Sequence, residues 1–360
     1  MKRVRKTHPA AQLASMIMPI EASACHAVRH ARLAGQRPAR RAPRAAGRTT
    51  LALLLALSLA LAALPSLTAC GSEDAATPGS ASNADGTTNG PAYEIPTMAT
   101  AAFDASAATG ENGAVIDTSS LAQGYVAASA ESESRLKFQV IQGDMSYNYD
   151  LDGDGAPLVC PLNMGDGSYT FRVMQNTSGN NYVELYSTAA DVTLDSEFEP
   201  FLRPNVFCSY TDQSACVAKA KELAAGATNE GDVMRAVYEW IVDNIAYDTE
   251  KAIALADATG YVPDPDSTIA QGKGICFDYA SLAAAMLRSL GIPCKIITGY
   301  VSPDGIYHAW NLVYLNGSWV SAEVIVESNT WTRIDLTFAA AGGASGYVGD
   351  GTTYTDRYTY

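Results

Sequence analysis

The sequence predicts an α+β fold in which helices pack on an antiparallel sheet, preceded by a small all-β module. Short runs of alternating apolar and polar residues, such as 136–141 and 169–174, predict the strands of the module. Apolar residues at helical spacing follow at 230–246. Further along, Asn316-Gly317 separates two strand-like runs, which is typical of a tight antiparallel hairpin. Helices followed by such strands favour an α+β layout over repeated βα units.

Residues 1–69 are predicted to be a signal peptide. The first 50 residues carry eleven Lys and Arg but one acid, and residues 51–63 form an apolar run. That run is too short for a membrane-spanning helix, which needs about 20 residues, and this order is typical of a signal peptide. The run leads to Leu67-Thr68-Ala69-Cys70, which resembles a bacterial lipobox. We expect Cys70 to carry a lipid after cleavage; the alternative is an ordinary signal peptide with an incidental cysteine.

The charge of the chain argues against a polyanionic partner. The 24 Lys and Arg and 38 Asp and Glu give a net charge of −14. Without the leader, which holds eleven of the bases and one acid, the net charge becomes −24. Such a surface repels nucleic acid and anionic lipid headgroups. We therefore expect no nucleic-acid partner, and an extracytoplasmic protein held at the bacterial membrane by the lipid on Cys70.

Composition divides the remaining chain into three parts. Residues 70–112 are small and polar and predict a flexible tether. Residues 113–205 carry strands and glycine-rich turns and predict the β module, and residues 206–360 predict the catalytic domain.

The run from Asp150 to Asp154 resembles the start of a calcium loop, but Pro161 stands where that loop needs a bidentate Glu. We therefore expect a polar hairpin turn there.

The catalytic domain is predicted to begin with helices and to continue with strands. A short helix is expected at 214–225, and Asn229 is suited to N-cap the next one, at 230–246. A third helix is expected from Cys276 to Leu290, because Gly291 suits its C′ position and the following Pro293 prevents continuation. Strands are expected at 295–301, 308–315, 319–327 and 331–338.

Cys276 and His308 are the candidate nucleophile and base. Cys276 opens a helix, whose terminal amides and dipole favour a thiolate and can hold an oxyanion. His308 is the one histidine after the leader, since the other three stand at positions 8, 26 and 30. A thiol and an imidazole suit nucleophilic catalysis. A single histidine excludes a multi-histidine metal site in the processed chain, and we expect no metal and no cofactor.

A third group should orient the imidazole of His308. Two carboxylates each follow a tryptophan by four residues, Glu323 and Asp335. We favour Asp335, because a short carboxylate on a neighbouring strand would hold the imidazole more rigidly. It would do so by accepting the Nδ1–H of His308. Glu323 stays the alternative. Asp278, two residues into the helix of Cys276, is expected to be a helix-start residue that the dipole favours.

Four stretches closely resemble the transglutaminase-like superfamily of papain-related thiol enzymes. They are GKGICFDYA (272–280), GYV (299–301), HAWNLVYLNGSW (308–319) and WTRIDLTF (331–338). The resemblance covers about 228–340 and implies a papain-like core of helices packed on an antiparallel sheet. The recurring cysteine, histidine and aspartate of the family carry over to Cys276, His308 and Asp335. The strand expected at 319–327 makes the stretch before Asp335 longer than the family's usual hairpin.

The resemblance implies acyl transfer from an amide bond through a thioester on Cys276. Resolution by water gives a protease or amidase, and resolution by an amine gives a cross-linking transglutaminase. Bacterial members with a preceding β module are more often described as proteases. We therefore expect a secreted, lipid-anchored cysteine protease or amidase acting on peptides or proteins. The calcium dependence of animal transglutaminases is not expected, because the sequence shows no matching site.

Other functions and the remaining cysteines stay open at this point. A cross-linking transglutaminase is one alternative, and a non-catalytic surface-binding protein with the same fold is another. The retained cysteine and histidine argue against the second. A transporter's substrate-binding lipoprotein would show repeated βα alternation, which the sequence lacks. In an oxidising compartment Cys208 and Cys216 could form a disulfide, and Cys160 and Cys294 could pair or stay buried thiols.

Overall fold

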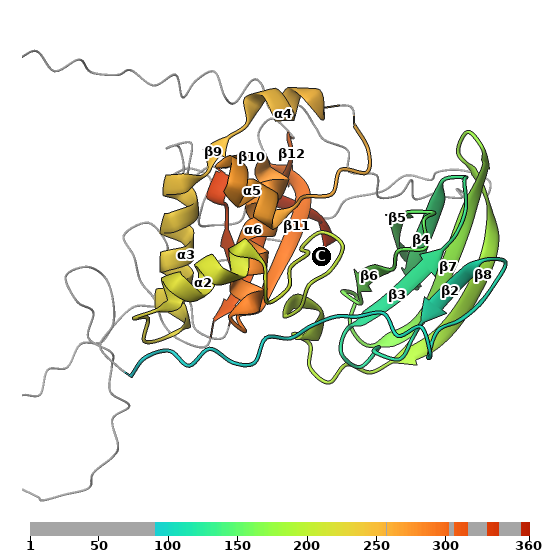
Figure 1. Cartoon of the computed structure of the whole chain (residues 1–360), viewed down its shortest axis with the longest axis horizontal. Helices are drawn as coiled ribbons and strands as arrows, with labels where there is room; N and C mark the ends of the chain where they lie inside the picture. The colour runs from blue at the N-terminus through green and yellow to red at the C-terminus, as the bar shows by residue number, and fades with distance from the viewer. Residues whose placement is uncertain (1–90, 257, 302–305, 316–329, 338–353) are drawn as a thin grey trace, which may run out of the picture. The chain divides into compact units, whose positions relative to one another are not determined.

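The computed structural model describes residues 91–256, 258–301, 306–315, 330–337 and 354–360, which Figure 1 shows in colour. Several predicted features lie outside the described residues: the signal peptide, Cys70, the Asn316-Gly317 hairpin, and the strand at 319–327 with Glu323. In the part of the chain that is described, no helix is long and apolar enough to cross a membrane.

The β module consists of two four-stranded antiparallel sheets, with strand orders β1-β2-β3-β6 and β5-β4-β7-β8. Their bounds are β1 (Thr109–Glu111), β2 (Ala114–Asp117), β3 (Tyr125–Ala130), β4 (Leu136–Gln142), β5 (Met145–Leu151), β6 (Leu158–Pro161), β7 (Gly167–Ser178) and β8 (Asn181–Val192). The predicted alternation on β4 and β7 is confirmed. Phe138 and Phe171 are both fully buried and stack with their ring centroids 6.5 Å apart.

The run from Asp150 to Asp154 is a connection between the two sheets and not the expected hairpin turn. It joins β5 to β6, and these strands belong to different sheets. Asp150 pairs with Lys137 at 2.5 Å, and the Asp154 carboxylate accepts from the amide of Ala156 at 2.8 Å. The Asp150 carboxylate therefore joins β5 to its neighbour β4, and the Asp154 carboxylate holds the turn before β6.

The folded structure begins earlier than the predicted end of the tether at residue 112. Tyr93 donates its backbone N–H to Ala227 at 2.7 Å and its hydroxyl to the Leu290 carbonyl at 2.9 Å. Arg203 donates to the carbonyl of Thr100 at 2.8 Å. The small polar residues of this segment predict that it is solvated and flexible. In the structure, contacts with distant parts of the chain hold the backbone around Tyr93 and Thr100 in place.

Helices α2, α3, α5 and α6, together with the short α4, precede the second part of the sheet structure (Figure 1). Their bounds are α2 (Ala215–Ala224), α3 (Glu230–Asn244), α4 (Thr249–Ala254), α5 (Pro265–Gln271) and α6 (Cys276–Ser289), with a 3-10 turn η1 (Glu199–Phe201) before them. Every residue of α6 is buried. It packs against α2, α3 and α5 and against strands β11 and β12, so it is the central element of this region.

The helix ends follow the sequence signals. The Asn229 side chain accepts from the amide of Asp232 at 2.9 Å, which confirms it as the N-cap of α3. Gly291 follows the C-cap of α6 with a φ of 81°, in the left-handed region that favours glycine. The predicted end of this helix is therefore confirmed.

A four-stranded antiparallel sheet of order β13-β12-β11-β14 packs against α6. Its strands are β11 (Cys294–Val301), β12 (Ile306–Leu315), β13 (Thr330–Ile334) and β14 (Tyr354–Thr359), and a small parallel pair joins β9 (Ala246–Tyr247) to β10 (Lys273–Gly274). The expected α+β class, with helices packed on an antiparallel sheet after a β module, is confirmed. Two details differ. β14 was not predicted, and β13 ends at Ile334, where the Asp335 carboxylate accepts the amide of Thr337 and turns the chain.

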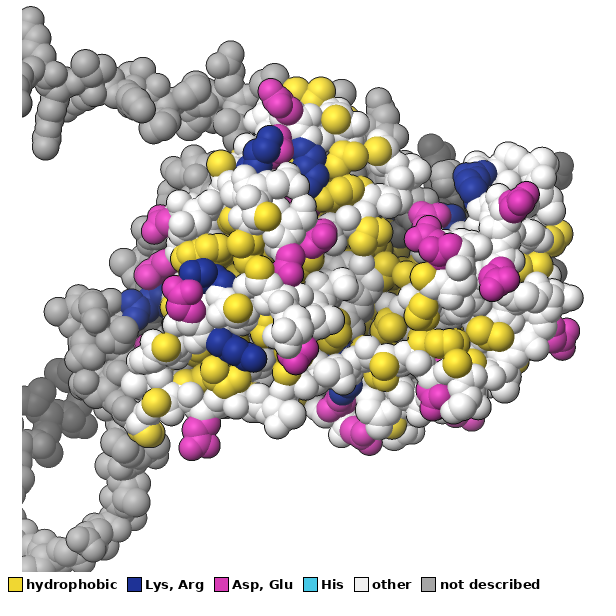
Figure 2. Space-filling model, in the orientation of Figure 1, with side chains coloured by type: hydrophobic (Ala, Val, Ile, Leu, Met, Phe, Trp, Pro, Cys, Tyr) yellow, Lys and Arg dark blue, Asp and Glu magenta, His cyan; other side chains and the backbone are white. Residues whose placement is uncertain are grey.

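The exposed face in Figure 2 carries Asp and Glu side chains scattered among a smaller number of Lys and Arg side chains. Several of the cations are paired: Lys219 with Glu222, Lys251 with Asp278, and Lys273 with Asp248. This distribution agrees with the acidic balance of the sequence.

Arg288, a buried cation on α6, ties three separate segments together. Its guanidinium donates to the carbonyls of Cys294 at 2.8 Å, Arg203 at 3.0 Å and Tyr360 at 2.9 Å. The side chain is fully buried. Because a buried guanidinium is tolerated when its donors are satisfied, this residue fixes the end of β14 against α6 and β11.

Arg288→Met should lower the free energy of unfolding by about 2–4 kcal/mol, because it leaves buried carbonyls without their donor. Arg172→Met is the matched control. Arg172 faces Glu184 across 3.6 Å in a pair with both side chains more than 40% exposed, and such a pair contributes less than about 1 kcal/mol. Urea unfolding of both variants measures the difference. Equal losses in the two variants would contradict the anchoring role of Arg288.

Candidate active site

The start of α6 places Cys276 at the first helical position. β10 pairs with β9 immediately before the helix and fixes the approach of the chain. Gly274 is required there, because a Cβ at this position would lie 2.6 Å from the Cβ of Asp278. The thiol of Cys276 therefore projects at a helix N-terminus, where backbone N–H groups lack intrahelical partners.

Asp278 holds this helix start in place, which confirms the expected helix-start role. Ile275, the N-cap residue, has no polar side chain, and its N–H donates instead to Asp278 Oδ2 at 2.8 Å. The same carboxylate is 2.7 Å from Lys251 Nζ and accepts a hydrogen bond from the Tyr261 hydroxyl. Asp278 is fully buried, and these donors compensate for its desolvation.

His308 on β12 lies between Cys276 and Asp335. Its Nε2 is 2.9 Å from Asp335 Oδ2, and the Cys276 side chain is near enough to help raise the pKa of the ring. The expectation that the aspartate would hold Nδ1 is wrong, because Nε2 makes this contact. Since Nε2 is occupied by the carboxylate, Nδ1 is the nitrogen left to meet the thiol.

The surroundings of His308 favour its protonated form. Burial by itself lowers the pKa of the imidazole, but the charges and hydrogen bonds of Asp335 and Cys276 outweigh it and raise the pKa from 6.5 to about 10. His308 and Asp335 are each 1% exposed, and Cys276 is 5% exposed. This arrangement shields all three side chains from bulk water.

Two residues that sequence reasoning missed support this arrangement. Tyr354 on β14 donates its hydroxyl to Asp335 Oδ2 at 3.0 Å. Asn311 on β12 donates to the carbonyl of Ala280 on α6 at 3.0 Å and to that of Lys295 on β11 at 3.2 Å. Asn311 stands three residues after His308, so a buried amide in the same strand was the available signal. Tyr354 gave none, because its strand was not predicted.

The structure distinguishes the two predicted orienting acids only in part. Asp335 lies directly after β13 and contacts His308. Glu323 is outside the described residues. Among the described residues, no group of three or more His, Cys, Asp and Glu side chains could hold a metal ion.

The remaining described cysteines are buried thiols, and Cys208 and Cys216, for which the sequence left a disulfide open, are not bridged. Cys208 instead directs its sulfur to the Ser281 carbonyl on α6 at 3.7 Å. Burial raises the pKa of Cys208 to about 11 and that of Cys294 to about 12, and it also raises the pKa of Cys160 and Cys216. These thiols are therefore poor nucleophiles near neutral pH.

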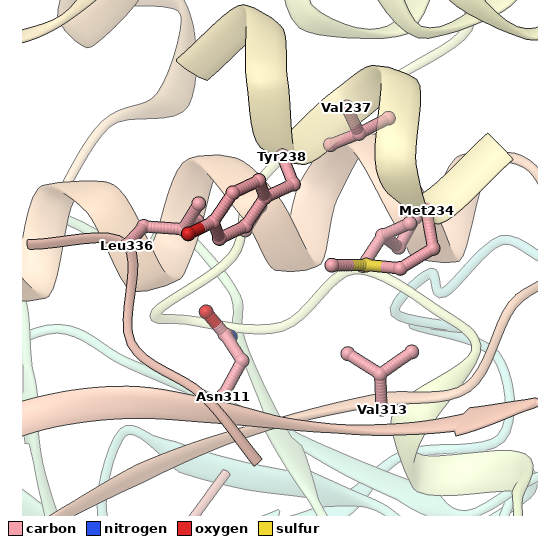
Figure 3. Close-up of a pocket in the computed structure, with 8 residues that line it drawn as sticks. Met234, Val237, Tyr238, Asn311, Val313 and Leu336 are labelled. Carbon is pink, nitrogen blue, oxygen red and sulfur yellow. The ribbon is translucent and has the colours of Figure 1, made fainter. Parts of the chain in front are cut away.

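A small pocket lies beside this site but does not contain it. Figure 3 shows Asn311 and Val313 pointing from β12 toward Met234, Val237 and Tyr238 of α3. Leu336, next to Asp335, also lines the pocket. Its lining is mostly apolar and does not include Cys276 or His308, so this pocket supplies neither nucleophile nor base.

Comparisons with known proteins agree with the fold. Residues 217–335 match the family model of the transglutaminase-like superfamily. Kyphoscoliosis peptidase of Mus musculus is 31% identical over 108 residues, which are 27% of this chain and 16% of that protein. The Homo sapiens protein is 26% identical over 166 residues, 43% of this chain and 25% of that protein. The chain thus spans a quarter or less of these relatives.

Among solved structures, a candidate cysteine protease from Cytophaga hutchinsonii is similar, with a TM-score of 0.34 and 18% identity. The similarity covers 64% of this chain and 73% of that one.

The imidazolium of His308 should persist to about pH 10, since its pKa lies above the ordinary value of 6.5. Asp335→Asn should lower the pKa, because burial then acts against less opposing charge. Glu323→Gln should leave it unchanged. ¹⁵N NMR titration of the imidazole measures this, and His308 is the one histidine beyond residue 30. If Glu323→Gln moves the titration and Asp335→Asn does not, the orienting acid is Glu323.

Proposed function

Starting from the transglutaminase-like domain at residues 217–335, we propose that this protein is a secreted, lipid-anchored thiol enzyme that cleaves amide bonds in peptides or proteins. The observation that carries the proposal is the 2.9 Å contact of His308 with Asp335, together with a raised pKa of the same imidazole to which Cys276 contributes. A thiol, an imidazole and a carboxylate in this order provide a nucleophile, a proton carrier and an orienting group.

In the first half of the reaction, the thiolate of Cys276 attacks the carbonyl carbon of the amide. Backbone amides in the first turn of α6 stabilise the negative charge on the carbonyl oxygen. The C–N bond then breaks, and the leaving amine takes a proton from the His308 imidazolium. The products are a free amine and a thioester on Cys276, and His308 is left neutral.

In the second half, His308 takes a proton from a water molecule that attacks the thioester carbon. The C–S bond breaks, the carboxylic acid leaves, and the thiolate–imidazolium pair is restored. Throughout, Asp335 holds the imidazole by Nε2 and stabilises its positive charge. An amine in place of water would give transamidation by the same steps. We favour water because the sequence relatives in mouse and human are named as peptidases.

The location is part of the same proposal. A basic leader, a short apolar run and the lipobox-like Leu67-Thr68-Ala69-Cys70 support export and lipid attachment at Cys70. The enzyme would then act on the outer side of the bacterial membrane, on substrates that reach its surface.

Iodoacetamide should label Cys276 faster than any other described cysteine near neutral pH, because the four others are fully buried. Peptide mass mapping of the native protein measures this. Cys276→Ala should abolish the fast labelling and the release of new amino termini from labelled casein, whereas Cys294→Ala should preserve both. Incorporation of a primary amine in place of hydrolysis would identify a transamidase. Fast labelling at Cys160 or Cys294 in the wild type would refute the assignment of the nucleophile.

Cys70→Ser should prevent lipid attachment, since the serine hydroxyl cannot form the thioether. Expressed in a bacterial host, the variant should lose the mass of the lipid and should leave the detergent phase on Triton X-114 partition. Cys25→Ser, which changes another cysteine of the leader, is the control and should partition like the wild type. A Cys70→Ser protein that stays equally membrane-bound would contradict anchoring through this residue.

A further inference from the structure

The carboxylate of Asp335 is held by more than the imidazole. Its Oδ2 accepts from the Tyr354 hydroxyl at 3.0 Å and lies 2.9 Å from His308 Nε2. Its Oδ1 accepts from the backbone N–H of Thr337 at 3.2 Å. The donors come from β12, from the turn after β13 and from β14. The orientation of the carboxylate therefore depends on segments that are far apart in the sequence.

Tyr354 is placed against the same aromatic group that borders His308. Its ring packs edge-on against Trp310, with the centroids 4.9 Å apart, and Trp310 stacks near the His308 ring at 6.3 Å. Tyr354, Trp310 and Asp335 are all buried. The phenol is therefore fixed by packing as well as by its hydrogen bond, and it has little freedom to leave Asp335.

β14, which carries Tyr354, is anchored at its far end. Tyr360 and Ile296 exchange two backbone hydrogen bonds of 2.8 Å, and Arg288 donates to the Tyr360 carbonyl. The Thr359 amide also donates to the Tyr147 hydroxyl of the β module at 3.3 Å. These contacts fix the register of β14 on β11, in which Tyr354 lies opposite Val301.

We propose that Tyr354 is a positioning residue, which sets the orientation of the Asp335 carboxylate toward His308 and so makes β14 part of the active site. The proposal rests on the proposed thiol-enzyme function and adds a fourth side chain to it. Tyr354 acts through Asp335, whose carboxylate accepts its hydroxyl.

The physical basis is the geometry of a buried carboxylate. Without the Tyr354 hydroxyl, the Asp335 carboxylate could rotate or accept a hydrogen bond from water. With it, Oδ2 has a second partner besides His308, and the carboxylate is restricted to one orientation. A hydrogen bond to a charged group is stronger than one between neutral groups, and a loss of 1.36 kcal/mol of transition-state stabilisation corresponds to a factor of about 10 in rate. Loss of the phenol hydroxyl should therefore cost the reaction about tenfold or somewhat more.

The test compares Tyr354→Phe with Tyr358→Phe in the full chain. The first variant keeps the ring against Trp310 and removes the hydroxyl; the second removes a hydroxyl from the same strand, on a buried tyrosine whose ring packs against Tyr147 and Tyr360. Hydrolysis of p-nitrophenyl acetate gives kcat and KM. The downfield Nε2 proton of His308, followed by NMR, reports its contact with Asp335 without any substrate.

Tyr354→Phe should lower kcat about tenfold with KM nearly unchanged, and should shift or broaden the Nε2 proton signal. Tyr358→Phe should change neither. An unmoved Nε2 signal in Tyr354→Phe, or equal effects in both variants, would overturn the proposal. If the wild type neither turns over the ester nor reacts with iodoacetamide, the thiol-enzyme function fails. The NMR comparison then still decides whether Tyr354 orients Asp335.

Discussion

The buried contact between His308 and Asp335 is the interaction on which the rest of the site depends. An imidazolium and a carboxylate, each 1% exposed, are stable in a protein interior when they are paired and their other polar atoms are satisfied. The thiol of Cys276 lies on one side of the ring, and Tyr354 and Thr337 donate to the carboxylate on the other. If any one of these partners is removed, the remaining ones must compensate for a buried charge that has lost a contact.

The second constraint is that α6 must start at one position relative to β12. Asp278 fixes the first turn of the helix, and Asn311 ties the strand to the helix one turn further on. Lys251 on α4 and Tyr261 in the following loop both contact the Asp278 carboxylate and bring their segments to the start of α6. The position of Cys276 relative to His308 is thus set by polar contacts of Asp278 and Asn311, which hydrophobic packing of α6 alone would not specify.

Local signals in the sequence were enough for α2, α3 and α6, and they indicated Cys276, His308 and Asp335 as candidate site residues. Asn229 and Gly291 mark helix ends by backbone chemistry that acts within a few residues. Tyr354 could not be found in this way, because its strand is short, its middle residues are exposed, and its partner β11 lies more than 50 residues earlier. The contact of Nε2, and not Nδ1, with Asp335 likewise depends on how the His308 ring is oriented in the folded chain, which no residue pattern encodes.

The buried thiols have a consequence for how long the protein would survive after export. Cys160, Cys208, Cys216 and Cys294 are all fully buried and unpaired. In an oxidising compartment the folded chain shields them from oxidants, but each global opening exposes all four to disulfide formation in non-native pairs. Such pairing would trap the unfolded chain. The lifetime of the folded protein would then be governed by the height of the unfolding barrier, a kinetic quantity, and not by the equilibrium free energy of folding.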